Sequence, residues 1–172
     1  MLCLGAALLP LAACQSTPDK PLPAVTQVDL PRFMGDWYVI AHIPTFIERK
    51  ATDAVESYRL AADGTIETTF RFREGDAAGP LREYHPRGFV VPDTGNAVWG
   101  MQFIWPVKAE YVISHVDAAY TETIIARSAR DYVWIMARTP SIPEADFQRL
   151  SSIVAGQGYD IKQLQRVPQQ WR

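Results

Sequence analysis

The chain has 172 residues, 48% of them apolar, and a formal net charge of −2. This is enough material for one domain with a substantial core. Because 17 Lys and Arg face 19 Asp and Glu, the charge balance gives no reason to expect nucleic-acid binding. The two cysteines, Cys3 and Cys14, both precede the predicted folded body, so the sequence predicts no disulfide or thiolate site within it.

Residues 1–13 form an uncharged apolar run that is too short to span a bilayer, which needs about 20 residues. The run is typical of the core of an export signal. Its ending, Leu11-Ala12-Ala13-Cys14, resembles the lipobox of bacterial lipoproteins, which implies cleavage before Cys14 and acylation of that cysteine. The alternative is a disordered apolar tail with a chance cysteine. Because no Lys or Arg precedes the run, we expect the true start codon to lie upstream of Met1.

The residue after the cysteine bears on the destination of such a lipoprotein. In the sorting rule of enteric bacteria, Asp at this position retains a lipoprotein in the inner membrane, whereas this chain has Gln15. The resemblance therefore implies a lipid anchor in the outer membrane, with the domain facing the periplasm. Residues 14–31 contain several prolines and no apolar period, so they predict an extended, solvated tether between anchor and domain.

From Asp36 onward the pattern is that of β-strands. Thr65–Arg73 alternates cleanly between apolar and polar residues, and Asp63-Gly64 is a strong hairpin signal. Pro86 is expected to disturb the longest segment. Eight short segments at regular spacing indicate a sandwich or a barrel; they are Trp37–Ile43, Ala54–Leu60, Thr65–Arg73, Leu81–Val91, Ala97–Trp105, Tyr111–Asp117, Thr123–Arg127 and Tyr132–Arg138.

The period changes once, after the last of these segments. Ser141-Ile142-Pro143-Glu144 is typical of a capping box with an early proline, and an apolar stripe at helical spacing follows it. Gly156 and Gly158 end the predicted helix, and Tyr159–Leu164 predicts one short final strand. The chain is therefore predicted to be all-β: an eight-stranded antiparallel up-and-down β-barrel with one C-terminal α-helix packed on its wall.

The domain, residues 32–172, resembles the lipocalins, and specifically the bacterial outer-membrane lipoprotein lipocalins. Three motifs carry the resemblance, in order: Gly35-Asp36-Trp37-Tyr38, residues 111–120 ending in Asp117 and Tyr120, and residues 130–140 around Arg138. The resemblance implies a barrel that is closed at one end, where Arg138 covers Trp37 beside Gly35, and open to ligand at the other. It also implies binding of a fatty acid or lysophospholipid in outer-membrane lipid storage, transport or repair, with no catalysis, no cofactor and a possible homodimer.

Strand alternation points a set of large side chains inward. They either line a ligand cavity or fill it, and the resemblance favours a cavity. A one-residue register slip would invert the faces. The candidate cavity residues are Glu56, Tyr58, Phe70, Phe72, Trp99, Met101, Phe103, Trp134 and Met136, and the candidate entrance lid contains Phe46, Ile47 and Arg49.

Other functions have weaker support in the sequence. His42, His85 and His115 are isolated, with no partner at metal-ligand spacing, so no metal site is predicted. His115 could pair with Asp117 on one strand face, and a lipid-acting enzyme would use His115 with Asp117 or Glu56 as its base, but no nucleophile accompanies them. A third hypothesis is a binder of another hydrophobic ligand, such as haem or a bilin.

Overall fold

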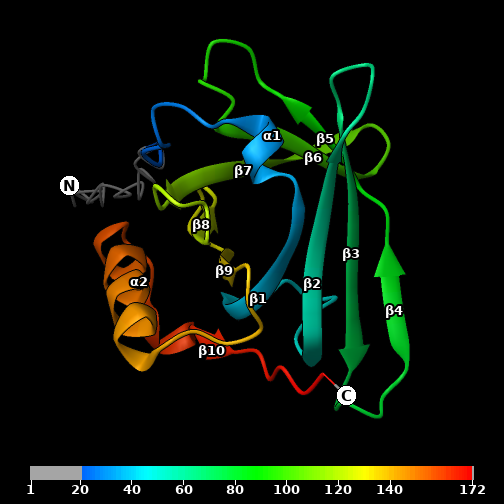
Figure 1. The fold of residues 1–172 in the computed structure, drawn as a ribbon, viewed down its shortest axis with the longest axis vertical. Helices are drawn as coiled ribbons and strands as arrows, with labels where there is room; N and C mark the ends of the chain where they lie inside the picture. Colours follow the sequence, from blue (N-terminus) through cyan, green and yellow to red (C-terminus); the bar gives the residue numbers. More distant parts are fainter. Residues whose placement is uncertain (1–20, 172) are drawn as a thin grey trace, which may run out of the picture.

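The computed structural model describes residues 21–171 of the chain. Within this range the strands follow one another around a single antiparallel barrel (Figure 1). Their bounds are β1 (Gly35–Ile43), β2 (Ala51–Leu60), β3 (Ile66–Glu74), β4 (Leu81–Tyr84), β5 (Arg87–Val90), β6 (Val98–Ile104), β7 (Val107–Val116), β8 (Glu122–Ala126) and β9 (Val133–Ala137).

Pairing between the first and last of these strands closes the barrel. Tyr38 of β1 lies opposite Ala137 of β9, and Ile43 lies opposite Val133. β4 and β5 both pair with β3 and are separated by Pro86, so they are two halves of one barrel strand. The part of the chain that the structure describes is therefore the eight-stranded barrel that the sequence predicts, with the disturbance at Pro86 included.

The connections divide the barrel into two ends. The turns after β2, after β5 and after β7 meet at the end where Gly35 begins β1, and we call this the closed end. The loop from Pro44 to Lys50, and the turns after β3, β6 and β8, meet at the opposite end, which we call the mouth. A large buried cluster fills the interior of the closed half, and a second cluster lies between the barrel wall and the C-terminal helix.

That helix, α2 (Glu144–Gly156), packs outside the barrel at the left of Figure 1 and buries Leu150 and Val154. The predicted capping box is wrong, because Pro143 is the N-cap residue and no side chain caps the helix. The helix ends at Gly156, and Gly158 adopts a φ of +92° as the chain turns back. No helix within residues 21–171 is both long and apolar enough to cross a membrane.

The predicted final strand is also displaced. The Asp160 side chain accepts a hydrogen bond from the Lys162 amide and starts the 3₁₀ turn η1 (Ile161–Gln163) where a strand was expected. The strand comes later, as β10 (Gln165–Arg166), and pairs with β1 through Ala41 and His42.

The segment before the barrel differs most from prediction. Leu22 and Val28 are buried, so this part of the expected solvated tether packs on the barrel wall instead. Their apolar side chains, with Val25 between them, recur every three residues and give the segment one buried face. Asp29 then caps a short helix that was not predicted, α1 (Leu30–Phe33). The proposed signal segment and Cys14 lie outside the described residues.

Candidate functional site

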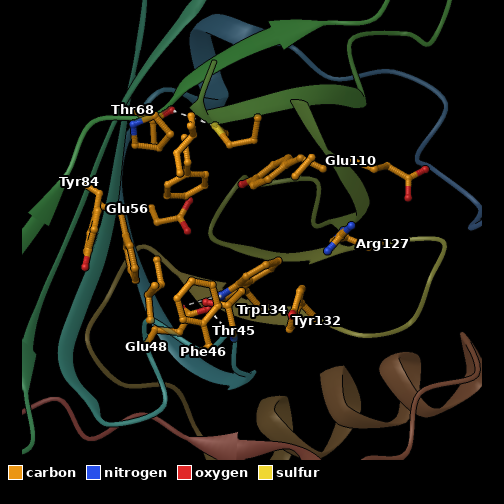
Figure 2. A pocket seen from close by; sticks show the side chains of 18 residues that line it. Thr45, Phe46, Glu48, Glu56, Thr68, Tyr84, Glu110, Arg127, Tyr132 and Trp134 are labelled. Carbon is orange, nitrogen blue, oxygen red and sulfur yellow. Dashed lines mark hydrogen bonds between the residues drawn. The ribbon is translucent and has the colours of Figure 1, made fainter. Parts of the chain in front are cut away.

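The mouth of the barrel leads into a cavity of about 360 Å³. This volume is within the range of small-molecule pockets. The loop from Pro44 to Lys50, which we call the lid loop, and the surrounding strands send side chains into the cavity (Figure 2). The lining residues are Thr45, Phe46, Ile47, Glu48, Glu56, Thr68, Phe70, Tyr84, Pro86, Met101, Phe103, Ile104, Ala109, Glu110, Tyr111, Arg127, Tyr132 and Trp134.

A buried polar chain forms the floor of the pocket. The Tyr58 hydroxyl donates a hydrogen bond to the Glu56 carboxylate, and the Tyr58 and Tyr111 hydroxyls lie 2.5 Å apart. Since the Tyr58 proton is used on Glu56, Tyr111 is left to donate to Tyr58. Below this chain the aromatic rings of the closed end begin, so Glu56 marks the boundary between cavity and core.

Burial changes the protonation of this floor. It raises the pKa of Glu56 from 4.5 to about 7; the hydrogen bond from Tyr58 lowers the pKa and the nearby charge of Glu48 raises it. Burial and the charge of Glu56 also raise the pKa of Tyr58 and of Tyr111 well above 10. Glu56 can therefore gain or lose its proton near neutral pH while both tyrosines keep theirs.

Glu48 is a second buried carboxylate on the pocket wall, placed there by the lid loop. It accepts hydrogen bonds from Trp134 Nε1, at 3.2 and 3.1 Å, and from the Thr45 amide at 3.0 Å. His42 Nδ1 lies 3.6 Å from it. Burial alone would raise the pKa of Glu48, but the contact with His42 and the hydrogen bonds from Thr45 and Trp134 lower it overall. The inner pocket therefore contains two acidic groups and an otherwise largely apolar lining.

The cationic group of the pocket lies at the mouth. Arg127 donates from Nη1 to Asp131 at 2.9 Å, and its guanidinium lies 5.3 Å from the centre of the Tyr132 ring. The Arg127 Nε atom is buried and has no hydrogen-bond partner among the described residues. Arg127 is the one cationic side chain among the described residues that line the pocket, whose acidic members are Glu48, Glu56 and Glu110.

The closed end is sealed by Arg138, whose Cζ lies 3.8 Å from the centre of the Trp37 ring. Arg138 also donates hydrogen bonds to the carbonyl oxygens of Asp36 and Arg32, both at 2.8 Å. Gly35 has a φ of +93°, and a Cβ there would lie 3.4 Å from the Arg138 guanidinium. The arginine therefore joins a cation–π contact to several backbone carbonyls, as the sequence motifs predict.

The structure divides the predicted cavity residues into two groups. Glu56, Phe70, Met101, Phe103 and Trp134 line the pocket, as do Phe46 and Ile47 of the predicted lid. Tyr58, Phe72, Trp99 and Met136 are not among the lining residues and pack in the buried cluster below or beside the cavity. Arg49 lies in the predicted lid, where it is exposed and does not line the pocket.

Sequence reasoning missed Glu48, Tyr111 and Arg127 in particular. Tyr111 begins the buried part of its strand, and alternation from Ile113 could have placed it inside. Glu48 lies in an irregular loop and Arg127 in a turn, where no period reveals the direction of a side chain.

The site that the alternative enzyme hypothesis would need is not assembled. His115 is absent from the pocket lining, and the Asp117 carboxylate is occupied within its own turn by the amides of Thr121 and Glu122. Burial lowers the pKa of His115, as does the charge of Arg149. Within residues 21–171 no three His, Cys, Asp or Glu side chains are grouped as metal ligands.

Comparison with protein families matches residues 28–169 to the Lipocalin-like domain. Temperature-induced lipocalin-1 of Arabidopsis thaliana is 30% identical over 166 residues, covering 89% of this chain and 86% of that protein. Outer membrane lipoprotein Blc of Citrobacter freundii is 27% identical over 159 residues, covering 92% and 89%.

Solved structures with the same fold include insecticyanin of the tobacco hornworm, Manduca sexta. Its TM-score is 0.68 at 14% identity, over 86% of this chain and 84% of that one. The cockroach allergen Per a 4 has a TM-score of 0.66 at 18% identity, over 86% and 92%. At these identities the likeness concerns the fold alone.

Proposed function

This chain belongs to the lipocalin family, and we propose that it is a non-enzymatic binder that holds one fatty acid or lysophospholipid in the pocket at the mouth of its barrel. The observation that carries the proposal is the shape and chemistry of that pocket: a largely apolar cavity, entered from one end and bounded by a floor of buried hydroxyls and carboxyls. Burial of an acyl chain supplies the driving force, at about 0.8 kcal/mol per methylene.

The charges support an orientation with the tail inward and the head group at the mouth. Glu48 and Glu56 would repel a buried carboxylate or phosphate, whereas Arg127 at the mouth is the one cationic side chain among the described lining residues. Burying an anion beside two carboxyls would be costly. The acyl chain therefore occupies the inner pocket, and the ligand's anionic group lies beside Arg127.

Displacement of a fluorescent fatty acid by saturated fatty acids of rising chain length tests this function. We expect affinity to rise about fourfold per added methylene, or about 15-fold per pair, until the pocket is full. Arg127→Gln should weaken binding of a fatty acid but leave binding of the uncharged monoacylglycerol of equal chain length unchanged. Failure of any acyl chain to displace the probe would contradict the proposal.

We further propose that residues 1–13 are a signal peptide and that acylated Cys14 anchors the domain to the outer membrane, facing the periplasm. Relatives named Outer membrane lipoprotein Blc support this location. The mature protein should carry the mass of its acyl groups on Cys14, and Cys14→Ser should move it from the membrane to the soluble fraction. An unmodified cysteine in membrane-purified protein would contradict the anchor.

Haem or a bilin is the alternative ligand, and the pocket gives it less support. Neither histidine nor cysteine, the common haem iron ligands, is among the side chains that line the cavity in the described structure. Visible absorbance of the protein as purified would favour this alternative, and a colourless protein with bound lipid would favour the lipid.

A further inference from the structure

The turn between β6 and β7 places large apolar side chains in solvent at the rim of the mouth. Ile104, Trp105 and Val107 are 75%, 83% and 66% exposed, and Phe46 in the lid loop is 77% exposed. Exposed apolar side chains are ordinary when they are scattered, but these gather on the loops around one opening. Such a group indicates a surface that is covered by a partner.

This apolar rim is continuous with the pocket. Phe46, Phe103 and Ile104 line the cavity with part of their surface and are exposed to solvent with another part. An acyl chain that enters the pocket must therefore pass over the rim. The partner that covers the rim must leave the passage open, which a bilayer does and a protein seated across the mouth would not.

The path of the N-terminal segment is a second observation that favours a bilayer at the mouth. The Leu22 amide donates a hydrogen bond to Ser128 Oγ, in the turn whose Arg127 and Tyr132 line the mouth. The segment then runs along the wall toward the closed end, where the Val28 amide donates to the Gly95 carbonyl. The described chain therefore begins at the mouth.

The length of the chain before Pro21 matters for an anchored protein. Cys14 lies seven positions before Pro21, a stretch that spans at most about 25 Å even when fully extended. An anchor at Cys14 holds the mouth rim next to the membrane directly. To hold the closed end there instead, the stretch would have to return along the whole barrel wall.

We propose that the rim formed by Phe46, Ile104, Trp105 and Val107 docks on a lipid bilayer, so that the mouth faces the membrane and acyl chains pass between bilayer and pocket without crossing water. We favour a lipid bilayer as the partner because an indole at the tip of an exposed loop is well suited to the lipid head-group region. Arg49 and Lys50, exposed in the lid loop, add positive charge at the same end. The passage of acyl chains rests on the proposed lipid binding, whereas the docking of the rim on a bilayer does not.

The depth of Trp105 in the bilayer tests the docking in the full chain. The protein is reconstituted in phosphatidylcholine vesicles brominated on the acyl chains, which quench nearby tryptophans. We expect a quenched component that is lost in Trp105→Phe, which keeps the rim apolar, and retained in Trp171→Phe, which removes another exposed indole, on the C-terminal tail. Equal quenching of the wild type and Trp105→Phe would overturn the proposal.

Vesicle affinity gives a second measurement with a matched control. Trp105→Ser with Val107→Ser removes rim side chains that do not line the pocket, and Leu60→Ser with Val91→Ser removes exposed apolar side chains at the closed end. Residues 1–20 are the same in both variants, so any contribution they make to vesicle affinity is the same. We expect the rim variant to bind vesicles roughly tenfold or more weakly than the control. Equal affinities would contradict the docking.

Two further measurements separate this proposal from the proposed lipid binding and from a protein interface at the rim. In solution, the rim variant should bind a fluorescent fatty acid as the wild type does; if neither binds it, the proposed function fails, while quenching of Trp105 would still support the docking. Sedimentation without lipid tests a second copy as the occupant. A wild-type dimer that the rim variant converts to monomer would assign the rim to a protein interface and overturn the bilayer proposal.

Discussion

The two ends of this barrel use similar side chains for opposite purposes. At the closed end, Phe33, Trp37 and Trp99 are buried, and the centre of the Phe33 ring lies 5.0 Å from that of Trp37 and 5.6 Å from that of Trp99. At the mouth, the Trp105 side chain is 83% exposed and Trp134 borders an open cavity. The same strands run from one end to the other, so the difference lies in what covers each end.

The closed end is covered by the chain itself. The helix α1 brings Phe33 over the barrel, the Trp37 indole donates to the Phe33 carbonyl at 2.8 Å, and Arg138 lies over Trp37. At the mouth, the lid loop lines part of an open cavity instead. Buried aromatic packing is therefore concentrated at one end, and the other end remains open for a ligand.

The sharpest test of this division compares two tryptophans. Trp37→Ala should lower the free energy of unfolding by about 3–5 kcal/mol, because it empties a packed core site and leaves Arg138 without its ring. Trp105→Ala should change it by less than about 0.5 kcal/mol. Urea unfolding measures both. Similar costs for the two substitutions would show that the ends do not differ in this way.

The buried Glu56 at the boundary should make stability depend on pH. Its pKa of about 7 exceeds the ordinary 4.5, so folding takes up a proton between these values. Its contribution is complete below pH 4.5, falls as pH rises and is gone above about pH 7, a loss of up to about 3 kcal/mol. Glu56→Gln should remove this slope.

The matched control for that titration is Asp93→Asn, which removes an exposed carboxyl in the turn after β5. Unfolding in urea at pH 5, 6, 7 and 8 should give the control the same slope as the wild type. If Glu56→Gln also keeps the wild-type slope, Glu56 is not the group that titrates.

Filling the pocket should abolish binding without unfolding the protein. Ala109 lines the cavity, so Ala109→Trp should weaken fatty-acid binding by roughly tenfold or more while the melting temperature changes by only a few degrees. The control is Lys108→Trp on the neighbouring position, where the lysine lies over the Phe89 ring outside the pocket. Equal loss of affinity in both variants would argue against ligand in this cavity.

The smallest expected effect is the pH dependence of affinity. For an uncharged monoacylglycerol, affinity should fall between pH 6 and pH 8 by up to about tenfold, because the ligand's tail must contact Glu56 after it ionises. In Glu56→Gln the affinity should be constant over this range. Calorimetric titration measures it, and a wild type with no pH dependence would place the tail away from Glu56.

The comparison of the two ends also explains which residues the sequence could predict. Alternation along a strand gives the side of the sheet, which correctly places Trp99, Met101 and Phe103 of β6 on one face. It does not give the height along the barrel axis. Trp99 lies at the closed end in the core, Met101 lies at the cavity, and Phe103 lies at the rim.

The features outside regular strands were the least predictable. The barrel and the break at Pro86 follow from local patterns, whereas the closure of the barrel by Arg138 was implied by the family resemblance. The packed segment around Leu22 and Val28, and the buried position of Glu48, depend on contacts with distant strands, which no local period reports. Of the two acidic groups of the inner pocket, Glu56 was predicted from the sequence and Glu48 emerged only from the structure.

Native mass spectrometry of the protein purified from its own membrane tests the central claim most directly, because it reports ligand mass and stoichiometry together. The account predicts one fatty acid or lysophospholipid per chain, retained in Lys108→Trp and lost in Ala109→Trp. A bound mass that persists in Ala109→Trp, or a wild-type protein that carries a tetrapyrrole instead of a lipid, would contradict it.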